Sequence, residues 1–306
     1  MRIETKAKLE YLKGTKSAIA SALVEKGQTV SSTDTFRSYA DKVRAIKSGG
    51  GMEPGVYYKR YETYHNESDA KTFIWYNNNL YVFTYSGSYL FDVIRNDGYR
   101  KWTTIVSGYQ MKSVNMSQTV FLNGKIHFAA GGKGHYVFDG ETITQLNDIP
   151  AENAIKSAVL YNGTIYAVDR YRLYAWEEST DTWTEMAYYA NTYDNSWRLL
   201  VSHGELFGIC GYDTLLYSNG SFTKQGECES FPTWVHNGFA YGDDGFYNIV
   251  KYDPYTGTSK TVGAKIRFTT TYECSSDTPT PNKFLVVGAT GKFLDCVEVI
   301  ISEDES

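Results

Sequence analysis

The chain has 306 residues, of which 42% are hydrophobic and 21% charged, so it can bury a sizeable core without disulfide or metal staples. Lys and Arg number 30 against 35 Asp and Glu, a formal net charge of -5, which does not supply the basic surface of a nucleic-acid-binding module. No apolar run approaches the roughly 20 residues that span a bilayer, and residues 1–6 lack the apolar core of a signal peptide. We therefore expect a protein made in a cytoplasm, without nucleic acid partners and without membrane insertion.

The aromatic content is high, with 27 Tyr, 6 Trp and 15 Phe against only 6 Pro. Aromatic side chains favour strands, so this composition predicts a mainly β protein. The four cysteines are far apart and form no C-x-x-C pair, which indicates buried free thiols rather than a zinc site.

Residues 1–47 differ from the rest and predict a hairpin of two amphipathic helices. The first apolar stripe has near-helical spacing and consists of Leu9, Leu12, Ile19, Ala22 and Leu23. Lys26-Gly27 ends this helix, and a new helix starts near Thr33-Asp34. The second stripe consists of Phe36, Tyr39, Ala40, Val43 and Ile46. Residues 48–54 form a Gly-rich linker, and residues 55–306 remain for the β domain.

The same helical residues carry a family resemblance, with the pattern T-K-x-x-I…K-G…F-x-x-Y-A-x-x-V between Thr15 and Val43. This pattern resembles a short N-terminal module of tail and baseplate-associated proteins from phages of Gram-positive bacteria and from phage-tail-like particles. The resemblance covers residues 1–47 alone. It implies that the module attaches the C-terminal domain to the particle. The two apolar stripes supply the predicted docking residues, namely Leu9, Leu12, Ile19, Leu23, Phe36, Tyr39 and Val43.

A repeated unit occupies the second part of the chain. Short Asn-Gly-like turns begin at residues 77, 123, 162, 203 and 237, which gives intervals of 46, 39, 41 and 34 residues. Repeats of about 40–50 residues with a strand hairpin in each are typical of a β-propeller. Asn-Gly tolerates positive φ at both central positions, so each repeat is predicted to contain a tight type I′ hairpin.

The number of blades is predicted as six, with five and seven as alternatives. Residues 265–272, 283–289 and 293–301 supply three strands after the fifth repeat, and residues 55–61 can supply the fourth. Closure by strands from both ends of the domain removes open sheet edges. Several details resemble kelch-type blades, namely Gly131-Gly132, Tyr136, Trp183 and the turn at residues 252–257, but the match is degenerate and carries no kelch function over.

No catalytic constellation is found in the sequence. The segment Asn96 to Trp102 has the wrong spacing for a sialidase turn and does not recur, and the glycines at 131–134 lack the spacing of a phosphate-binding loop. Asp243-Asp244 is interpreted as a turn, with a weak Ca²⁺ site as the alternative. The sequence therefore predicts a protein that is not an enzyme and that has no cofactor and no metal.

Aromatic residues on the predicted loops suit a glycan or protein surface, because they combine an apolar ring with polar neighbours. His127 and His203 are interpreted as structural, whereas His135, on a predicted loop, is a candidate ligand contact. The full set of predicted ligand-binding residues is Arg170, Tyr171, Tyr188, Tyr189, Trp197, Tyr212 and His135.

These observations lead to one functional hypothesis and two alternatives. The hypothesis is a structural and adhesive component of a phage tail or tail-like particle, made in the bacterial host cytoplasm. It would be present in several copies, with other tail or baseplate proteins and a host-surface glycan or protein as partners. The alternatives are a purely architectural decoration protein and a kelch-like lectin unrelated to phages.

Overall fold

The computed structural model describes residues 13, 15–17, 19–23, 30–31, 35 and 39 near the N-terminus. In the rest of the chain it describes residues 55–65, 69–85, 90–98, 101–111, 119–130, 132–190, 197–230, 232–244, 248–264, 271–276, 283–290 and 293–302. The chain divides into two units, Met1–Pro54 and Gly55–Ser306.

The described part of the first unit is helical at residues 13, 15–17, 19–23 and 39. Leu23 and Tyr39 are buried, Ile19 is half-buried, and Lys16 Nζ lies 5.9 Å from the centroid of the Tyr39 ring. Because Leu23 and Tyr39 are already covered, their prediction as docking contacts is corrected to packing contacts. The other predicted docking residues lie outside the described part of the chain, namely Leu9, Leu12, Phe36 and Val43.

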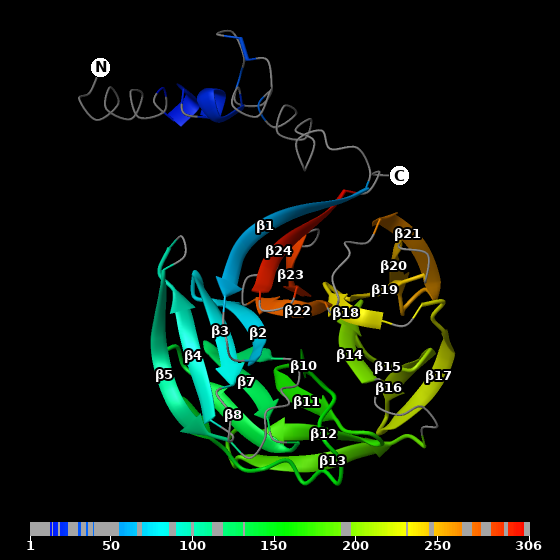
Figure 1. Cartoon of the computed structure of the whole chain (residues 1–306). Helices are drawn as coiled ribbons and strands as arrows, with labels where there is room; N and C mark the ends of the chain where they lie inside the picture. Colours follow the sequence, from blue (N-terminus) through cyan, green and yellow to red (C-terminus); the bar gives the residue numbers. More distant parts are fainter. Residues whose placement is uncertain are drawn as a thin grey trace, which may run out of the picture. The chain divides into compact units, whose positions relative to one another are not determined.

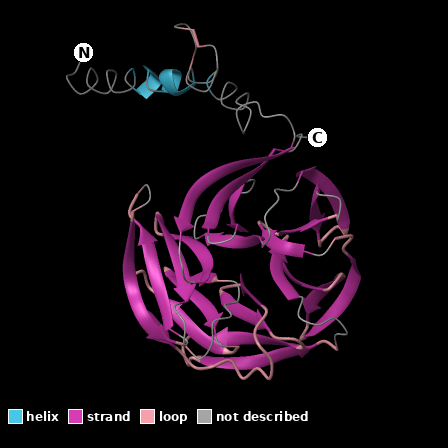
Figure 2. Cartoon of the chain, viewed as in Figure 1, coloured by secondary structure: helices cyan, strands magenta, loops and turns pink. Residues whose placement is uncertain are grey.

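The second unit is an all-β propeller, in which sheets are arranged around a common centre (Figure 1) and strands predominate (Figure 2). Four of its sheets have four strands each, paired in chain order. The first two are β6 (Val120–Leu122), β7 (Lys125–Ala130), β8 (Gly134–Phe138) and β9 (Ile143–Gln145), and β10 (Ser157–Tyr161), β11 (Thr164–Val168), β12 (Arg172–Glu177) and β13 (Thr182–Tyr188). The next two are β14 (Trp197–Ser202), β15 (Glu205–Cys210), β16 (Asp213–Ser218) and β17 (Ser221–Glu227), and β18 (Pro232–His236), β19 (Phe239–Asp243), β20 (Asn248–Asp253) and β21 (Thr258–Ala264).

The fifth sheet has eight strands in the order β1-β24-β23-β22-β2-β3-β4-β5. Its strands are β1 (Gly55–His65), β2 (Asp69–Tyr76), β3 (Asn79–Tyr85), β4 (Leu90–Asn96), β5 (Trp102–Gln110), β22 (Thr271–Ser276), β23 (Lys283–Thr290) and β24 (Phe293–Ser302). The described strands therefore form five sheets, and the prediction of six separate blades is wrong. The physical reason is a parallel pairing of β2 with β22, at Ile74↔Ser275 and Trp75↔Ser276, which joins two four-stranded sets into one sheet.

The two ends of the propeller domain meet in this sheet. β1 pairs antiparallel with β24 from Gly55↔Ser302 to His65↔Phe293, with one irregularity between Arg60 and Glu62. Figure 1 shows β1 beside β24, so a strand from the start of the domain lies at the edge of the sheet built by its end. This pairing covers an edge of β24 that would otherwise be open.

The predicted tight turns are confirmed. Asn123-Gly124, Asn162-Gly163, His203-Gly204 and Asn237-Gly238 each connect two paired strands through a two-residue loop, and φ is positive at all eight positions. Both central residues of a type I′ turn need positive φ, which explains glycine at the second position. The turn between β2 and β3 has the same geometry, with φ of 49° at Asn77 and 60° at Asn78.

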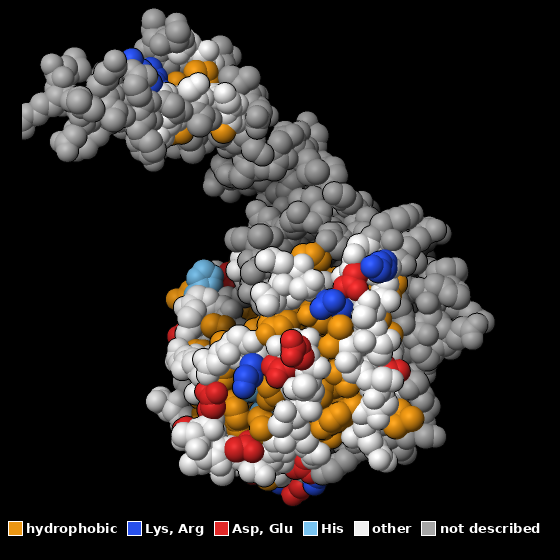
Figure 3. Space-filling view, turned by 90° about the vertical axis from the view of Figure 1, so that its left-hand side faces the viewer, with side chains coloured by type: hydrophobic (Ala, Val, Ile, Leu, Met, Phe, Trp, Pro, Cys, Tyr) orange, Lys and Arg blue, Asp and Glu red, His pale blue; other side chains and the backbone are white. Residues whose placement is uncertain are grey.

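The core lies between neighbouring sheets. Phe83 and Phe91 from the eight-stranded sheet contact Phe128 of β7, with ring centroids 5.5 Å and 6.3 Å apart. Further clusters of buried residues join β6–β9 to β10–β13, β10–β13 to β14–β17, and β14–β17 to β18–β21. Figure 3 views the side of the propeller on which β5 lies and shows hydrophobic side chains at the surface between polar ones.

Deletion of β1 tests the closure of the ring. We expect a chain that begins at Asp69 to lose several kcal/mol of unfolding free energy or to aggregate, because β24 becomes an open edge. A chain that begins at Gly55 keeps β1 and should melt at the temperature of the full chain. Thermal unfolding followed by circular dichroism compares the three proteins, and equal melting temperatures for the two shortened chains would contradict the role of β1.

Candidate functional site

The strands of each four-stranded sheet run antiparallel in chain order, so the turns fall at two opposite ends of the strands. One end carries the turns between second and third strands and the connections between sheets, and we call it the loop face. The other end carries the turns between first and second and between third and fourth strands, and we call it the turn face. Most of the predicted ligand-binding residues belong to the loop face of β10–β13 and β14–β17.

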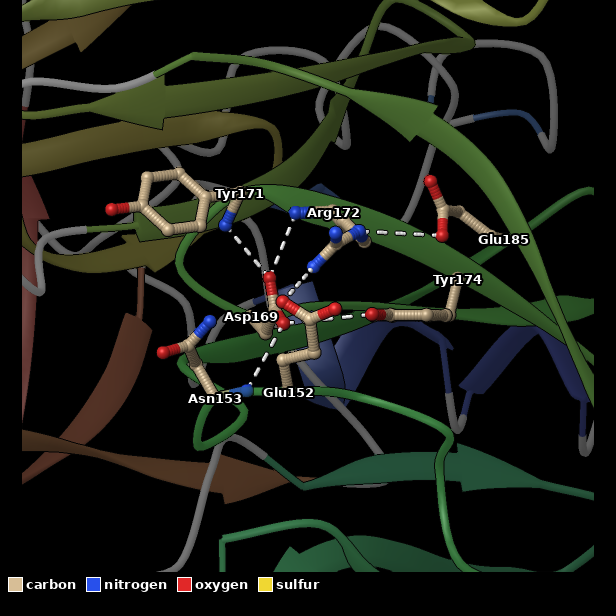
Figure 4. Close-up of polar contacts among 7 residues, drawn as sticks. All are labelled: Glu152, Asn153, Asp169, Tyr171, Arg172, Tyr174 and Glu185. Atoms are coloured by element: carbon tan, nitrogen blue, oxygen red, sulfur yellow. Dashed lines mark hydrogen bonds and ion pairs between the residues drawn. The ribbon is translucent and has the colours of Figure 1, made fainter.

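Asp169 holds the loop face of β10–β13 together (Figure 4). This carboxylate is fully buried, and its Oδ1 accepts the backbone N–H of Tyr171 at 2.7 Å and that of Arg172 at 2.8 Å. Its Oδ2 accepts the backbone N–H of Asn153, from the preceding connection, at 3.3 Å and the Tyr174 hydroxyl at 3.5 Å. The turn between β11 and β12 is therefore tied to the connection before β10.

Two further charged contacts fix Arg172. Its Nη1 lies 2.8 Å from Glu152 Oε2, and its Nε lies 3.4 Å from Glu185 Oε2 (Figure 4). Burial, and then the charge of Asp169, raise the pKa of Tyr174 to about 12, so this tyrosine stays a hydrogen-bond donor over the physiological pH range. The guanidinium of Arg172 is thus held on the surface by acidic partners, next to aromatic rings.

A group of aromatic and cationic side chains lies beside this network, and we call it the Tyr188 cluster. It consists of Arg170, Tyr171, Arg172 and Tyr188. The Arg170 guanidinium carbon lies 4.9 Å from the Tyr171 ring centroid, and that of Arg172 lies 5.8 Å from the Tyr188 centroid. The Tyr171 and Tyr188 rings lie 6.0 Å apart, and Tyr188 is 56% exposed. The structure therefore brings three of the predicted ligand-binding residues together and adds Arg172.

Two other predicted residues, Tyr189 and Tyr212, also lie on the loop face. Tyr189 is half-buried; its backbone N–H donates to the carbonyl of Tyr171 at 2.8 Å, and its hydroxyl donates to Asp213 Oδ2 at 3.1 Å. Tyr212, on the turn between β15 and β16, is 44% exposed. Tyr189 thus joins two sheets, whereas Tyr212 remains accessible on the loop face.

Trp197 is not a ligand contact, which corrects its prediction. Its side chain is 0% exposed and belongs to the core between β10–β13 and β14–β17, with its ring 5.3 Å from that of Phe222. Its Nε1–H donates to the carbonyl of Arg170 at 2.9 Å. A Cβ at Gly208 would lie 2.7 Å from this ring, so the indole fills a space that is closed by backbone. Through this hydrogen bond Trp197 holds the backbone of Arg170, a member of the Tyr188 cluster, in place.

His135 is also a core residue, which corrects its prediction as a loop contact. It lies on β8, is 2% exposed, and contacts the rings of Trp176 and Trp183. An N–H···N hydrogen bond of 3.1 Å joins His135 Nε2 and His127 Nδ1. Burial is the main cause that lowers the pKa of His127 to about 4 and that of His135 to about 3. Both imidazoles are therefore neutral near pH 7.

Asp169 and Arg172 were not among the residues predicted from the sequence. The signal was the segment Asp169-Arg170-Tyr171-Arg172, because an aspartate often accepts the backbone N–H of the second residue after it. Where Asp243 and Asp244 were considered for Ca²⁺, Asp244 accepts the backbone N–H and the side-chain Nδ2–H of Asn248. Among the described residues no group of three or more His, Cys, Asp or Glu side chains could hold a metal ion.

The two described cysteines, Cys210 and Cys228, are free and buried, and burial raises the pKa of the Cys228 thiol to about 11. No helix within the described residues is long and apolar enough to cross a membrane.

Comparisons with known proteins concern the fold. No family model and no curated protein matches the chain. Among solved structures, the extracellular domain of the hybrid two component system BT4673 from B. thetaiotaomicron is 13% identical, with a TM-score of 0.53 over 83% of this chain and 34% of that one. YCF48 from Cyanidioschyzon merolae is 12% identical, with a TM-score of 0.50 over 81% and 99%. YCF48 bound to a D1 peptide is 13% identical, with a TM-score of 0.49 over 83% and 99%.

The buried histidine pair predicts a loss of stability in acid. Each folded-state pKa lies below the ordinary 6.5. Below pH 6.5 the unfolded chain therefore binds protons at both histidines, whereas the folded chain binds them only near pH 4 at His127 and near pH 3 at His135. Stability is therefore complete above pH 6.5, and on the order of 3 kcal/mol per imidazole is lost by pH 4.

A double variant, His127→Phe with His135→Phe, isolates this effect. Its unfolding free energy, measured by urea titration at each pH, should fall less steeply between pH 6.5 and 4 than that of the wild type. Equal slopes for the two proteins would show that the pair does not contribute.

Proposed function

We propose that the chain is an adhesive component of a phage tail or phage-tail-like particle. Its N-terminal unit anchors it, and its propeller binds a host-surface glycan or protein through the loop face. The observation that carries the adhesive part is the Tyr188 cluster, in which the exposed Tyr188 lies beside the half-buried Tyr171, Arg170 and Arg172. The anchoring part is supported by the resemblance of residues 1–47 and by the separation of the chain into two units.

The physical properties of the cluster favour binding. Tyrosine and arginine contribute much of the energy at protein interfaces, and tyrosine rings pack against the C–H faces of sugars while the hydroxyls exchange hydrogen bonds. Asp169 and Trp197 fix the backbone beneath the rings, so little conformational freedom is lost when a ligand binds. Single contacts of this kind are weak, and several copies on one particle would raise the avidity.

Replacement of Tyr188 tests the adhesive role. Tyr188→Ala should weaken binding of the multivalent propeller to host cells or to isolated wall polysaccharide at least ~10-fold, while stability changes by less than about 0.5 kcal/mol because the ring is exposed. Tyr255→Ala is the matched control, since Tyr255 is 54% exposed but lies in the turn between β20 and β21 on the turn face. If wild-type propeller does not bind host cells at all, the architectural alternative is the better account.

Removal of residues 1–51 tests the anchoring role. The remaining chain keeps β1, so we expect it to fold but to be absent from assembled particles. Particles purified by sedimentation and probed for the shortened and full-length proteins provide the measurement. Shortened protein found in particles at the wild-type amount would contradict anchoring by this unit.

A further inference from the structure

A second candidate site lies on the turn face, far along the strands from the loop face. A hollow of 430 Å³ opens there between the turn that joins β2 to β3 and the end of β4 with the residues directly after it. Its volume falls in the lower part of the ~300–1,000 Å³ range of small-molecule sites. Six of the residues that line it carry aromatic or polar side chains, namely Trp75, Asn78, Asn79, Arg95, Asn96 and Asp97.

Asn78 departs from a rule that the other hairpins follow. Four turns between first and second strands have glycine at the second central position, and Asn78 alone carries a side chain there, at a φ of 60°. Positive φ disfavours any residue with a Cβ, although Asn tolerates it better than most. A local cost of this kind points to a use for the side chain, and Asn78 is one of the residues that line the hollow.

The neighbouring polar groups are held in place. Asn79 Nδ2–H donates to the carbonyl of Asn77 at 2.9 Å, and the backbone N–H of Gly98 donates to Asn96 Oδ1 at 3.2 Å. Arg95 Nε–H donates to Asp97 Oδ1 at 2.7 Å, and the Thr103 hydroxyl donates to Asp97 Oδ2. Groups fixed before binding lose little freedom when a ligand binds.

The charges in the hollow indicate an uncharged ligand. Hydrogen bonds from Thr103 and Arg95 hold the pKa of Asp97 below its usual value, so the carboxylate stays charged beside the guanidinium. The positive charge of Arg95 is therefore paired with the negative charge of Asp97, and an anionic ligand would find no free cation in this pair. Amide groups that both donate and accept, beside a single aromatic residue, match the alternating C–H and O–H groups of a sugar.

We propose that this hollow is a saccharide subsite that takes a neutral pyranose ring, with Trp75 against the ring and the amides of Asn78 and Asn79 bonded to its hydroxyls. The subsite is independent of the Tyr188 cluster, because it lies on another sheet and at the opposite end of the strands. It gives the propeller a carbohydrate contact whether or not the loop face binds host cells.

Ligand-observed NMR on the full chain tests the proposal, with saturation transfer to glucose, galactose, N-acetylglucosamine and rhamnose, and with glucuronate as the anionic probe. We expect at least one neutral sugar to receive saturation at its ring C–H groups. Asn78→Gly should weaken this binding at least ~10-fold, the equivalent of a lost hydrogen bond. Its melting temperature should stay equal or rise, because glycine suits the positive φ. Trp75→Ala should abolish the signal.

Two controls make the outcome specific. Asn162→Gly changes an asparagine at a φ of 50° in a turn outside the hollow and should leave sugar binding unchanged. Tyr188→Ala should also leave it unchanged, which separates this site from the loop face. The proposal is overturned if no neutral sugar binds, if binding survives Asn78→Gly, or if only glucuronate binds.

Discussion

The fold depends on apolar packing between neighbouring sheets. A single four-stranded sheet of this chain has apolar side chains on faces that it cannot bury alone, and the core clusters accordingly join one sheet to the next. Phe83 shows this directly, because its ring meets Phe91 in its own sheet and Phe128 and Phe138 in the adjacent one. Every sheet has a neighbour on both of its faces only when the sheets form a closed ring. The pairing of β1 with β24 then covers an exposed sheet edge.

The same packing decides which side chains are free for function. Trp197 and His135 lie between sheets, where each fills a space that a neighbour would otherwise leave empty. Their polar atoms therefore either bond to groups of the protein, as Trp197 Nε1–H does to the carbonyl of Arg170, or have no hydrogen-bond partner, as at His135 Nδ1. Exposed residues on the turns and connections escape this constraint, as Tyr188 and Tyr212 do on the loop face. There local hydrogen bonds rather than core packing set the geometry.

Local features of the fold were predictable from the sequence, and distant ones were not. The Asn-Gly turns follow from the φ preferences of adjacent residues, and they were found without the structure. The pairing of β2 with β22 joins residues about 200 positions apart and leaves no local pattern, so six blades were expected where five sheets occur. Tyr188 and Trp197 look alike in sequence, since both are aromatic residues at strand ends. Their exposures of 56% and 0% are set by the neighbouring sheet, which composition and spacing do not reveal.

The second central position of the hairpin turns is glycine in four repeats and asparagine, at Asn78, in the fifth. In the four hairpins that have it, glycine avoids the steric cost of a positive φ at this position. At Asn78 the chain keeps a side chain despite its φ, and it does so beside an arginine–aspartate pair and a tryptophan that line the same hollow. Burial does not explain the choice, since Asn78 is exposed. At the position where four other turns have glycine, Asn78 therefore gains nothing from burial, and the polar groups around it in the hollow can supply a benefit through a ligand at the turn face.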